Sequence, residues 1–389
     1  MVLFRSHGEI VEQLLAEPIS VASDFPPQLP PGSSALDLAG GHYVPLIDPI
    51  SVDLPAPDVV HSPSQSAPET EVFGKLAYRT SPAYVAKLTD CLVMGNRFVV
   101  VTSDRRPLYE SIPTYLGKKN PNWFNRDAGT LDRLFKLPVM EIDEPVALIC
   151  NSNWRNYWHW HTQTLPNIAL LRRAGLYPGK VKLLCCNPAD WREISLSLLG
   201  VQPSDTIGDS VSRVFKIREL YYPSFLDKTN MWLQSPELLD TYQAIAADVR
   251  GRAPPQEGLE LIYISRLDSK RRKLLNEIEL SDALEKFGFV TVIPGEINYL
   301  QQVAMMRSAR VIVAPHGAGL TNLAFAPKPS VVIEVIPSYW YSEAKSAFRV
   351  LAQLAGHRYC AVVSHDTNSE TMDWKVDVDA VVAVARRFL

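Results

Sequence analysis

The sequence has little that would place it in a membrane, on nucleic acid or in an oxidising compartment. No run approaches the roughly 18 apolar residues of a membrane-spanning helix, and the first residues lack the apolar centre of a signal peptide. Lys plus Arg (39) nearly balance Asp plus Glu (42), so the net charge of -3 gives no global reason to bind nucleic acid or anionic membrane. The five cysteines include no CxxC pair, which argues against zinc and redox motifs. We therefore expect a soluble, reduced, cytoplasmic protein whose anion sites are local.

The composition is that of a folded protein with an unusual first part. The 389 residues, 47% of them hydrophobic, are enough for two domains of roughly 150 residues each. Much of the proline, 30 residues in total, falls before residue 70, and proline fixes φ and removes backbone donors. We therefore expect residues 1–75 to form an extended arm without a core of its own. Whether the arm wraps the domains or forms a homodimer contact stays open.

Apolar runs typical of strands alternate with helical periods after residue 146. The expected strands lie at 146–150, 181–185, 261–265, 290–293, 311–314 and 331–336, and the expected helices include 191–200 and 273–287. Such alternation predicts parallel, doubly wound sheets and hence the α/β class. The simplest account is two Rossmann-like domains, 76–250 and 259–370, joined by a linker at 251–258. A C-terminal helix at 371–389 follows, for which packing back on the N-terminal domain is one option.

The strongest local motif is APHGAGLTN at 314–322, where an apolar strand runs directly into His316 and two glycines. Gly317 and Gly319 would let backbone N–H groups approach a ligand closely. The N-terminus of a following helix would add a positive dipole end, which suits a phosphate or a sugar oxygen. The alternative is a tight strand-to-helix turn that needs small residues for packing.

A second anion-binding feature follows the strand at 261–265. Arg266 is succeeded by the basic run DSKRRK at 268–273. In an open parallel sheet, ligands bind outside the carboxyl ends of the strands, and arginines hold diphosphates by forked hydrogen bonds. The alternative is a solvated basic turn paired with Glu277 and Glu279. Because two anion-binding features lie in one half of the chain, we favour the functional interpretation.

An aromatic and histidine-rich stretch, NWRNYWHWHTQTLP at 153–166, follows the first strand of the other half. A helix that begins near Asn156 would place His159 and Gln163 on one face and point His161 elsewhere. An imidazole there suits a general base acting on a sugar hydroxyl, because its unperturbed pKa lies near neutrality. The tryptophans suit either stacking on a sugar or simple core packing.

Glu334 lies inside the apolar run VVIEVIPS at 331–338. A carboxylate in an apolar strand is costly unless it is paired or lies near the open end of the strand. Its oxygens would accept hydrogen bonds from the ribose hydroxyls of a nucleotide. Alternatively, Glu334 would form a buried ion pair with an arginine such as Arg266. The sequence does not separate these two roles.

Taken in order, these motifs resemble glycosyltransferase family 61 over about residues 85–365. The resemblance is carried by NYWHW with LP at 165–166, ISR with RR and NE at 264–277, Gln302, MMRSARVIVAPHGAGLTN at 305–322 and VIEVI at 332–336. It implies a GT-B architecture, in which the two domains face each other across a cleft, and inverting transfer from a nucleotide sugar without a required metal. Bacterial-type members are associated with capsular or other surface polysaccharides. This chain departs from the family at Gln163, where Asp or Glu is usual, so the base would be His159 or His161, or the enzyme would be weakened.

The sequence therefore predicts three sets of site residues and neither a metal nor a cofactor. The catalytic set is His159, His161 and Gln163. The acceptor set is Asn156, Trp158 and Trp160. The donor set is Arg266, Arg271, Arg272, His316, Gly317, Ala318, Gly319, Leu320, Thr321, Asn322 and Glu334.

The predicted partners are a nucleotide-sugar donor and a glycan or lipid-linked glycan acceptor, with no nucleic acid. Peripheral association with the inner face of a membrane and a homodimer are left open. Two other functions compete with sugar transfer. One is a catalytically silent nucleotide-sugar binder that scaffolds polysaccharide assembly, motivated by Gln163. The other is a nucleotide-sugar epimerase of the same architecture. A dehydrogenase is least favoured, because no GxGxxG follows a strand with an acidic residue about 20 positions later.

Overall fold

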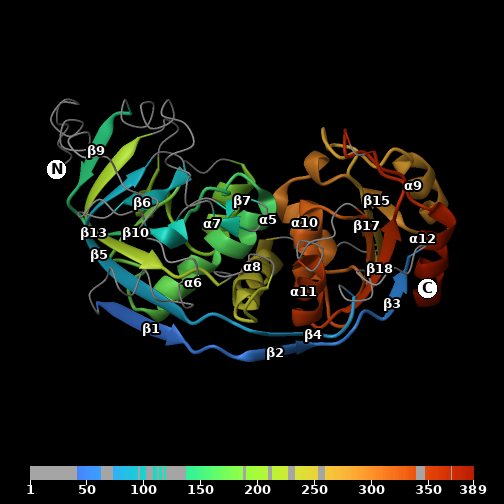
Figure 1. Ribbon diagram of the computed structural model, residues 1–389, viewed down its shortest axis with the longest axis horizontal. Helices are drawn as coiled ribbons and strands as arrows, with labels where there is room; N and C mark the ends of the chain where they lie inside the picture. The colour runs from blue at the N-terminus through green and yellow to red at the C-terminus, as the bar shows by residue number, and fades with distance from the viewer. Residues whose placement is uncertain are drawn as a thin grey trace. The chain divides into compact units, whose positions relative to one another are not determined.

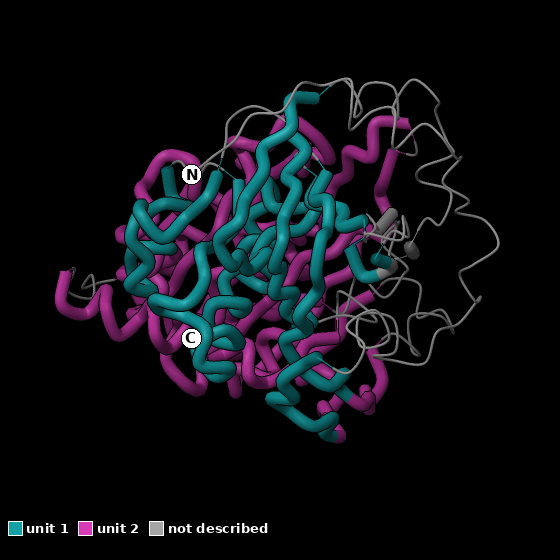
Figure 2. Tube along the Cα trace, turned by 90° about the vertical axis from the view of Figure 1, so that its left-hand side faces the viewer, with its two compact units in different colours: residues 1–50, 80–230 teal, residues 51–79, 231–389 magenta. Residues whose placement is uncertain are grey.

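The computed structural model describes residues 42–62, 73–94, 97–101, 108–111, 114–115, 118–119, 137–186, 190–208, 213–226, 233–252, 259–338, 347–368 and 370–389. The chain divides into two compact units, coloured in Figure 2. Unit 1 comprises residues 1–50 and 80–230, and unit 2 comprises 51–79 and 231–389. Among the described residues, no helix is long and apolar enough to cross a membrane.

Unit 1 is built on a mixed eight-stranded sheet. Its main path runs β1 (Tyr43–Ile47), β5 (Ala83–Met94), β13 (Val214–Pro223), β10 (Val146–Leu148), β11 (Lys182–Leu184) and β12 (Thr206–Ile207), while β6 (Val99–Val101) pairs with β5 and β9 (Val139–Ile142) with β13. The strands from β13 to β12 are parallel, whereas β5 is antiparallel to its neighbours. The connecting helices include α5 (Tyr157–His159), the π-helix η3 (Trp160–Thr164), α6 (Pro166–Arg173) and α7 (Trp191–Leu198). Gly200, at φ +71°, follows α7 and ends it as predicted.

Unit 2 holds a six-stranded sheet in which every pair is parallel. The order is β15 (Val290–Val292), β14 (Leu261–Ile264), β16 (Val311–Pro315), β17 (Val331–Pro337), β18 (Arg358–Ser364) and β3 (Val59–His61). In Figure 1, α10 (Tyr299–Met306) and α11 (Ala347–Leu354) lie on one side of this sheet, and α9 (Glu277–Glu285) and α12 (Val378–Ala385) lie on the other. The predicted α/β class with parallel sheet segments is therefore confirmed, but the sheet of unit 1 is mixed and not wholly parallel as expected.

Parts of the expected N-terminal arm are strands of the two units. β1 pairs with β5 in unit 1, and its Pro45 is tolerated because β1 is an edge strand. β3 extends the sheet of unit 2, and β2 (Ser51–Leu54) pairs with β4 (Leu76–Arg79). Arg349 of α11 holds this segment, since its Nη2 lies 2.8 Å from the carbonyl oxygen of Pro55 and 2.5 Å from that of Gly74. Residues 43–47, 51–54 and 59–61 of the expected arm thus form strands, whereas residues 1–41 and 63–72 lie outside the described part.

The observed division of the chain also differs from the predicted domains elsewhere. The unit boundary lies at 230–231, because α8 (Leu238–Arg252) packs on α10 and on the 3₁₀ helix η6 (Ala318–Phe325) of unit 2. Most of the predicted linker, residues 253–258, lies outside the described residues. The C-terminal helix was assigned to the N-terminal domain as one option. Instead, Val381 and Val384 of α12 belong to the core of unit 2, against β17, β18 and α9.

Candidate functional site

Arg266 and His316 lie at the carboxyl ends of two neighbouring parallel strands, β14 and β16. Arg266 Nη1 donates a hydrogen bond to the carbonyl oxygen of His316 at 2.7 Å, and its Nη2 lies 3.1 Å from Ser269 Oγ. The structure thus brings together Arg266, which precedes the basic run, and the loop that begins at His316, as the strand-end rule predicts.

The buried carboxylate of Glu277 supports the end of β14. Its Oε1 accepts hydrogen bonds from the backbone N–H of Arg266 at 2.6 Å, from Ser265 Oγ at 2.8 Å and from Tyr263 Oη at 3.1 Å. Burial, with the nearby Glu277 charge, raises the pKa of Tyr263 well above its usual value. Glu277 therefore orients the segment that presents Arg266, a role that sequence reasoning missed.

Both glycines of the loop are explained by close packing within the protein. A Cβ atom at Gly317 would overlap Arg266 Nη1, and a Cβ at Gly319 would lie 3.0 Å from Ile264 Cγ2. Gly317 is extended, at φ 169° and ψ 169°, so it needs room and not a left-handed backbone. The predicted short helix after Gly319 is the 3₁₀ helix η6, which starts at Ala318.

Only the first part of the predicted loop is accessible. Residues 316–319 are half-buried, whereas Leu320, Thr321 and Asn322 are buried. Asn322 Nδ2 donates to Oε1 of Gln302 on α10 at 2.9 Å, which ties η6 to that helix. Leu320, Thr321 and Asn322 therefore support the loop from within the core.

His316 belongs to a buried hydrogen-bonded chain with Glu334 and Tyr359. Its Nδ1 lies 2.5 Å from Glu334 Oε1, and Tyr359 Oη lies 2.5 Å from Glu334 Oε2. Glu334 is fully buried, and the ring of Phe348 meets the His316 ring edge-on with 5.2 Å between centroids. Burial and the Glu334 charge raise the pKa of Tyr359 well above its usual value. Of the two roles considered for Glu334, the arginine pair is replaced by a histidine and a tyrosine, and Tyr359 is a residue that the motifs did not point to.

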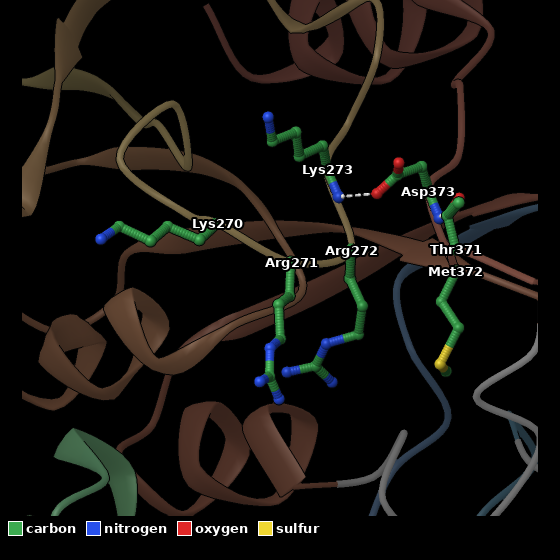
Figure 3. A pocket seen from close by; sticks show the side chains of 7 residues that line it. All are labelled: Lys270, Arg271, Arg272, Lys273, Thr371, Met372 and Asp373. Carbon is green, nitrogen blue, oxygen red and sulfur yellow. Dashed lines mark hydrogen bonds between the residues drawn. The ribbon is translucent and has the colours of Figure 1, made fainter.

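Arg271 and Arg272 line a separate pocket of about 500 Å³, whose wall consists of Lys270, Arg271, Arg272, Lys273, Thr371, Met372 and Asp373. Figure 3 shows the side chains of Arg271 and Arg272 extending the same way, while Lys270 extends away from them. The pocket joins two loops, because Asp373 Oδ1 accepts a hydrogen bond from the backbone N–H of Lys273 at 2.7 Å. Arg266 and the loop 316–322 do not line this pocket. The four basic residues nevertheless give it the charge that a phosphate needs.

In unit 1, Asn156 starts the predicted helix, since its Oδ1 accepts a hydrogen bond from the backbone N–H of Trp158 at 2.9 Å. The helix continues as the π-helix η3, which is a common feature of functional sites. His159 Nδ1 lies 2.9 Å from Gln163 Oε1, so the predicted pair meets. The same oxygen accepts a hydrogen bond from Asn151 Nδ2 at 2.6 Å. Asn151 was missed, although its place directly after the strand 146–150 is a signal for it.

His161 has a different environment. It is 1% exposed, its Nδ1 lies 2.9 Å from the carbonyl oxygen of Tyr157, and its ring contacts the rings of Tyr157 and Trp191 at centroid distances of 4.2 and 5.9 Å. Burial lowers the pKa of both His159 and His161 to about 4, so both rings are neutral at pH 7. His159 is half-buried, so its ring is more accessible than that of His161.

The predicted acceptor tryptophans are core residues. Trp160 is fully buried, with Nε1 donating to Ser195 Oγ at 2.9 Å, and Trp158 is 3% exposed. Their rings are covered by protein and do not present a stacking face. Trp154 carries the cationic contacts instead, with the guanidinium groups of Arg155 and Arg192 4.3 and 5.1 Å from its ring.

Comparison with known proteins bears on this arrangement. Residues 157–333 match the family Glycosyltransferase 61. The matched segment begins at Tyr157, beside His159 and Gln163, and ends one residue before Glu334. It therefore contains most of the site residues described above. This segment therefore has the similarity to glycosyltransferase family 61 that the motifs indicated.

Curated relatives agree with the family match. The chain is 34% identical over 109 residues to the EGF domain-specific O-linked N-acetylglucosamine transferase of Drosophila melanogaster, covering 27% of this chain and 20% of that protein. It is 41% identical over 78 residues to the beta-1,2-xylosyltransferase XAX1 of Oryza sativa subsp. japonica, covering 20% and 13%. The Mus musculus N-acetylglucosamine transferase is 30% identical over 110 residues. The matched stretches thus span one-fifth or less of these relatives' own length.

Proposed function

We propose that the protein is an inverting, metal-independent glycosyltransferase that moves a sugar from a nucleotide-sugar donor to a glycan or lipid-linked glycan. The observation that carries the proposal is the family match over residues 157–333, which includes both the His159 region and the Arg266 and His316 region. The GT-B architecture of two Rossmann-like domains is part of this proposal. So are a role in capsular or other surface polysaccharide synthesis and a cytoplasmic location, with peripheral association at the inner face of a membrane as an option.

In the proposed reaction, unit 2 binds the donor diphosphate. Arg266, the half-buried part of the loop 316–319 and the basic pocket with Arg271 and Arg272 supply positive charge and N–H donors. As the bond between sugar and diphosphate breaks, negative charge grows on the leaving oxygen, and preorganised donors stabilise it. Glu334 and Tyr359 hold the His316 ring in place and do not contact the ribose themselves, because Glu334 is fully buried.

Unit 1 supplies the acceptor side. His159 is half-buried and neutral at pH 7, since burial lowers its pKa to about 4. A neutral imidazole accepts a proton from an acceptor hydroxyl as that oxygen attacks the anomeric carbon. The names of the matched relatives make N-acetylglucosamine and xylose the first donor sugars to test.

Calorimetric titration with UDP, GDP and CMP nucleotides and their sugars tests the donor part of the proposal. We expect at least one of them to bind below millimolar concentration, and Arg271→Ala to weaken that binding about tenfold, as the loss of one charge-assisted contact does. Lys286→Ala, an exposed basic residue of unit 2 outside the pocket, is the matched control. The absence of binding by every nucleotide at millimolar concentration would reject the proposal.

A second function, a silent nucleotide-sugar binder that scaffolds polysaccharide assembly, is favoured by Gln163, an amide where the resembling family usually has a carboxylate. Transfer and donor-hydrolysis assays separate the two functions. Donor binding without turnover over a broad acceptor panel, together with an unchanged cellular phenotype for His159→Ala, would favour the scaffold. Turnover that His159→Ala abolishes would favour the transferase.

A further inference from the structure

The orientation of the Asn151 side chain is set by the backbone. The N–H of Asn153 donates a hydrogen bond to Asn151 Oδ1 at 2.9 Å. A backbone N–H can only donate, so the oxygen of the Asn151 amide must face Asn153. The amide nitrogen of Asn151 therefore points the other way, where it lies 2.6 Å from Gln163 Oε1.

This orientation determines that of Gln163 in turn. An amide NH₂ is a donor, so Gln163 must present its oxygen to Asn151. The same Oε1 lies 2.9 Å from His159 Nδ1. Because an amide oxygen only accepts, Nδ1 of His159 must carry the proton of that hydrogen bond. In the neutral ring, the lone pair is then on Nε2.

We propose that Asn151 and Gln163 are positioning residues that hold His159 as its Nδ1–H tautomer, which makes Nε2 the base for the acceptor hydroxyl. The inference rests on the proposed sugar transfer for the identity of the substrate, whereas the tautomer follows from the contacts of unit 1 alone. It also accounts for Gln163, because an amide oxygen meets the same ring nitrogen that a carboxylate oxygen would.

With His159 Nε2 as the base, the bonds formed and broken in the transfer step balance. The acceptor hydroxyl gives its proton to His159 Nε2 while its oxygen forms a bond to the anomeric carbon. The bond from that carbon to the diphosphate oxygen breaks, and the electron pair leaves with the nucleoside diphosphate. The imidazolium, with Nδ1–H still donating to Gln163, then releases the Nε2 proton to water. His161 is a poorer base here, because its side chain is 1% exposed and its ring packs against those of Tyr157 and Trp191.

The tautomer can be read without any substrate. In the full chain labelled with ¹⁵N-histidine, long-range ¹H–¹⁵N spectra at pH 7.5 distinguish a protonated ring nitrogen from one with a lone pair, and His159→Gln assigns the signal. We expect Nδ1 of His159 to be protonated and Nε2 to be unprotonated. The opposite tautomer in the wild-type protein would overturn the inference.

Asn151→Asp tests the positioning role. A carboxylate at 151 accepts, so the Gln163 amide must turn and present its NH₂ to His159 Nδ1, which moves the ring proton to Nε2. We expect the ¹⁵N chemical shift of His159 Nδ1 to become that of an unprotonated ring nitrogen and the shift of Nε2 that of a protonated one. We also expect kcat to fall about 100-fold, as for loss of a general base, while the affinity for the donor stays unchanged. Gln243→Glu, the same amide-to-acid change at an exposed residue of α8, should leave both readouts as in the wild type. Unchanged ring shifts in Asn151→Asp would reject the role.

Gln163→Glu is a second variant, which keeps an acceptor oxygen at residue 163. It tests the inference even if Asn151→Asp fails to fold. We expect it to retain the Nδ1–H tautomer and to move the acidic limb of the kcat profile to higher pH, because a carboxylate favours the imidazolium. An acidic limb at the same pH as in the wild type would contradict the hydrogen bond between residue 163 and His159 Nδ1. The predicted tautomer without transferase activity on any donor would reject the proposed function, whereas activity with the Nε2–H tautomer would reject this inference.

Discussion

Arg266 Nη1 and the carbonyl oxygen of His316 lie 2.7 Å apart, although 50 residues separate them in the sequence. The hydrogen bond joins the loops after two neighbouring strands, β14 and β16. A carbonyl oxygen that accepts from a guanidinium also keeps its loop in one position. The basic residue and the glycine loop therefore form one preorganised unit, which is what an anion site requires.

Gly317→Ala tests this unit. A Cβ at Gly317 would overlap Arg266 Nη1, so the guanidinium must move and lose its hydrogen bond to His316. We expect the affinity for the donor nucleotide, measured by calorimetry, to fall about tenfold, equivalent to about 1.4 kcal/mol. The circular dichroism spectrum should be unchanged.

Gly251→Ala provides the matched control, because a Cβ at Gly251 on α8 would meet nothing within 4 Å. We expect this variant to bind nucleotide as the wild type does and to be slightly more stable, since alanine favours the helix. Equal affinities for the Gly317 and Gly251 variants would show that the Arg266 contact does not support binding.

Removal of the Glu334 carboxylate should destabilise unit 2. Glu334→Ala leaves two donors, the buried Tyr359 Oη and the half-buried His316 Nδ1, without their acceptor. Each donor left unsatisfied costs about 1–3 kcal/mol, so we expect urea denaturation to show a loss of about 2–6 kcal/mol. Tyr359→Phe removes one donor only and should cost about 1 kcal/mol.

Glu296→Ala is the comparison for that series, because Glu296 is an exposed residue of the 3₁₀ helix η5 (Pro294–Glu296). It should change the free energy of unfolding by less than about 0.5 kcal/mol. If Glu334→Ala were no more destabilising than Glu296→Ala, the hydrogen-bonded chain from Tyr359 to His316 would not contribute to the stability of the protein.

The proximity of Arg266 and His316 could be predicted from the sequence. Each residue comes directly after an apolar run, and the carboxyl ends of parallel strands meet at one edge of a sheet. The pairing of His159 with Gln163 likewise follows from their spacing of four residues on a helix. In both cases a local pattern determines which side chains can meet.

The burial of a side chain and the identity of its hydrogen-bond partners could not be predicted in the same way. Trp158 and Trp160 read equally well as stacking surfaces or as core, and tertiary packing buried both. Glu334 pairs with His316 and Tyr359 because β18 lies beside β17, a neighbour relation that the local sequence does not contain. Segment 51–79 joins unit 2 through Arg349, whose long-range contacts have no local signal.

The stability of the protein should decrease as the pH falls below neutrality, in part through His357. This ring is 5% exposed, its Nδ1 accepts from the backbone N–H of Ser330 at 3.2 Å, and its Nε2 lies 3.1 Å from the carbonyl oxygen of Leu323. Burial lowers its pKa to about 4. The unfolded chain, with a histidine pKa of about 6.5, therefore binds more protons between these two values. The stability that neutral His357 contributes is fully present above about pH 6.5 and is lost as the pH falls towards 4.

Chemical denaturation at pH 7.5 and 4.5 measures this effect. We expect the wild type to lose about 1–3 kcal/mol through His357 over that interval, with His159 and His161 adding in the same direction. His357→Asn should be less stable at pH 7.5 and should show a smaller difference between the two pH values. An undiminished difference in the variant would exclude His357 as a source of the pH dependence.

Arg349→Met should loosen the hold of unit 2 on residues 51–79. Methionine retains the apolar stem in the buried site, but the carbonyl oxygens of Pro55 and Gly74 lose their guanidinium donor. We expect hydrogen exchange of β2 and β3, followed by mass spectrometry, to accelerate about tenfold or more, which corresponds to about 1.4 kcal/mol of local stability. Arg386→Met removes an exposed guanidinium that lies over the Phe287 ring, and it should leave exchange in β2 and β3 unchanged. Equal exchange in the two variants would mean that β-sheet pairing alone holds the segment, and the Arg349 contacts would then be dispensable.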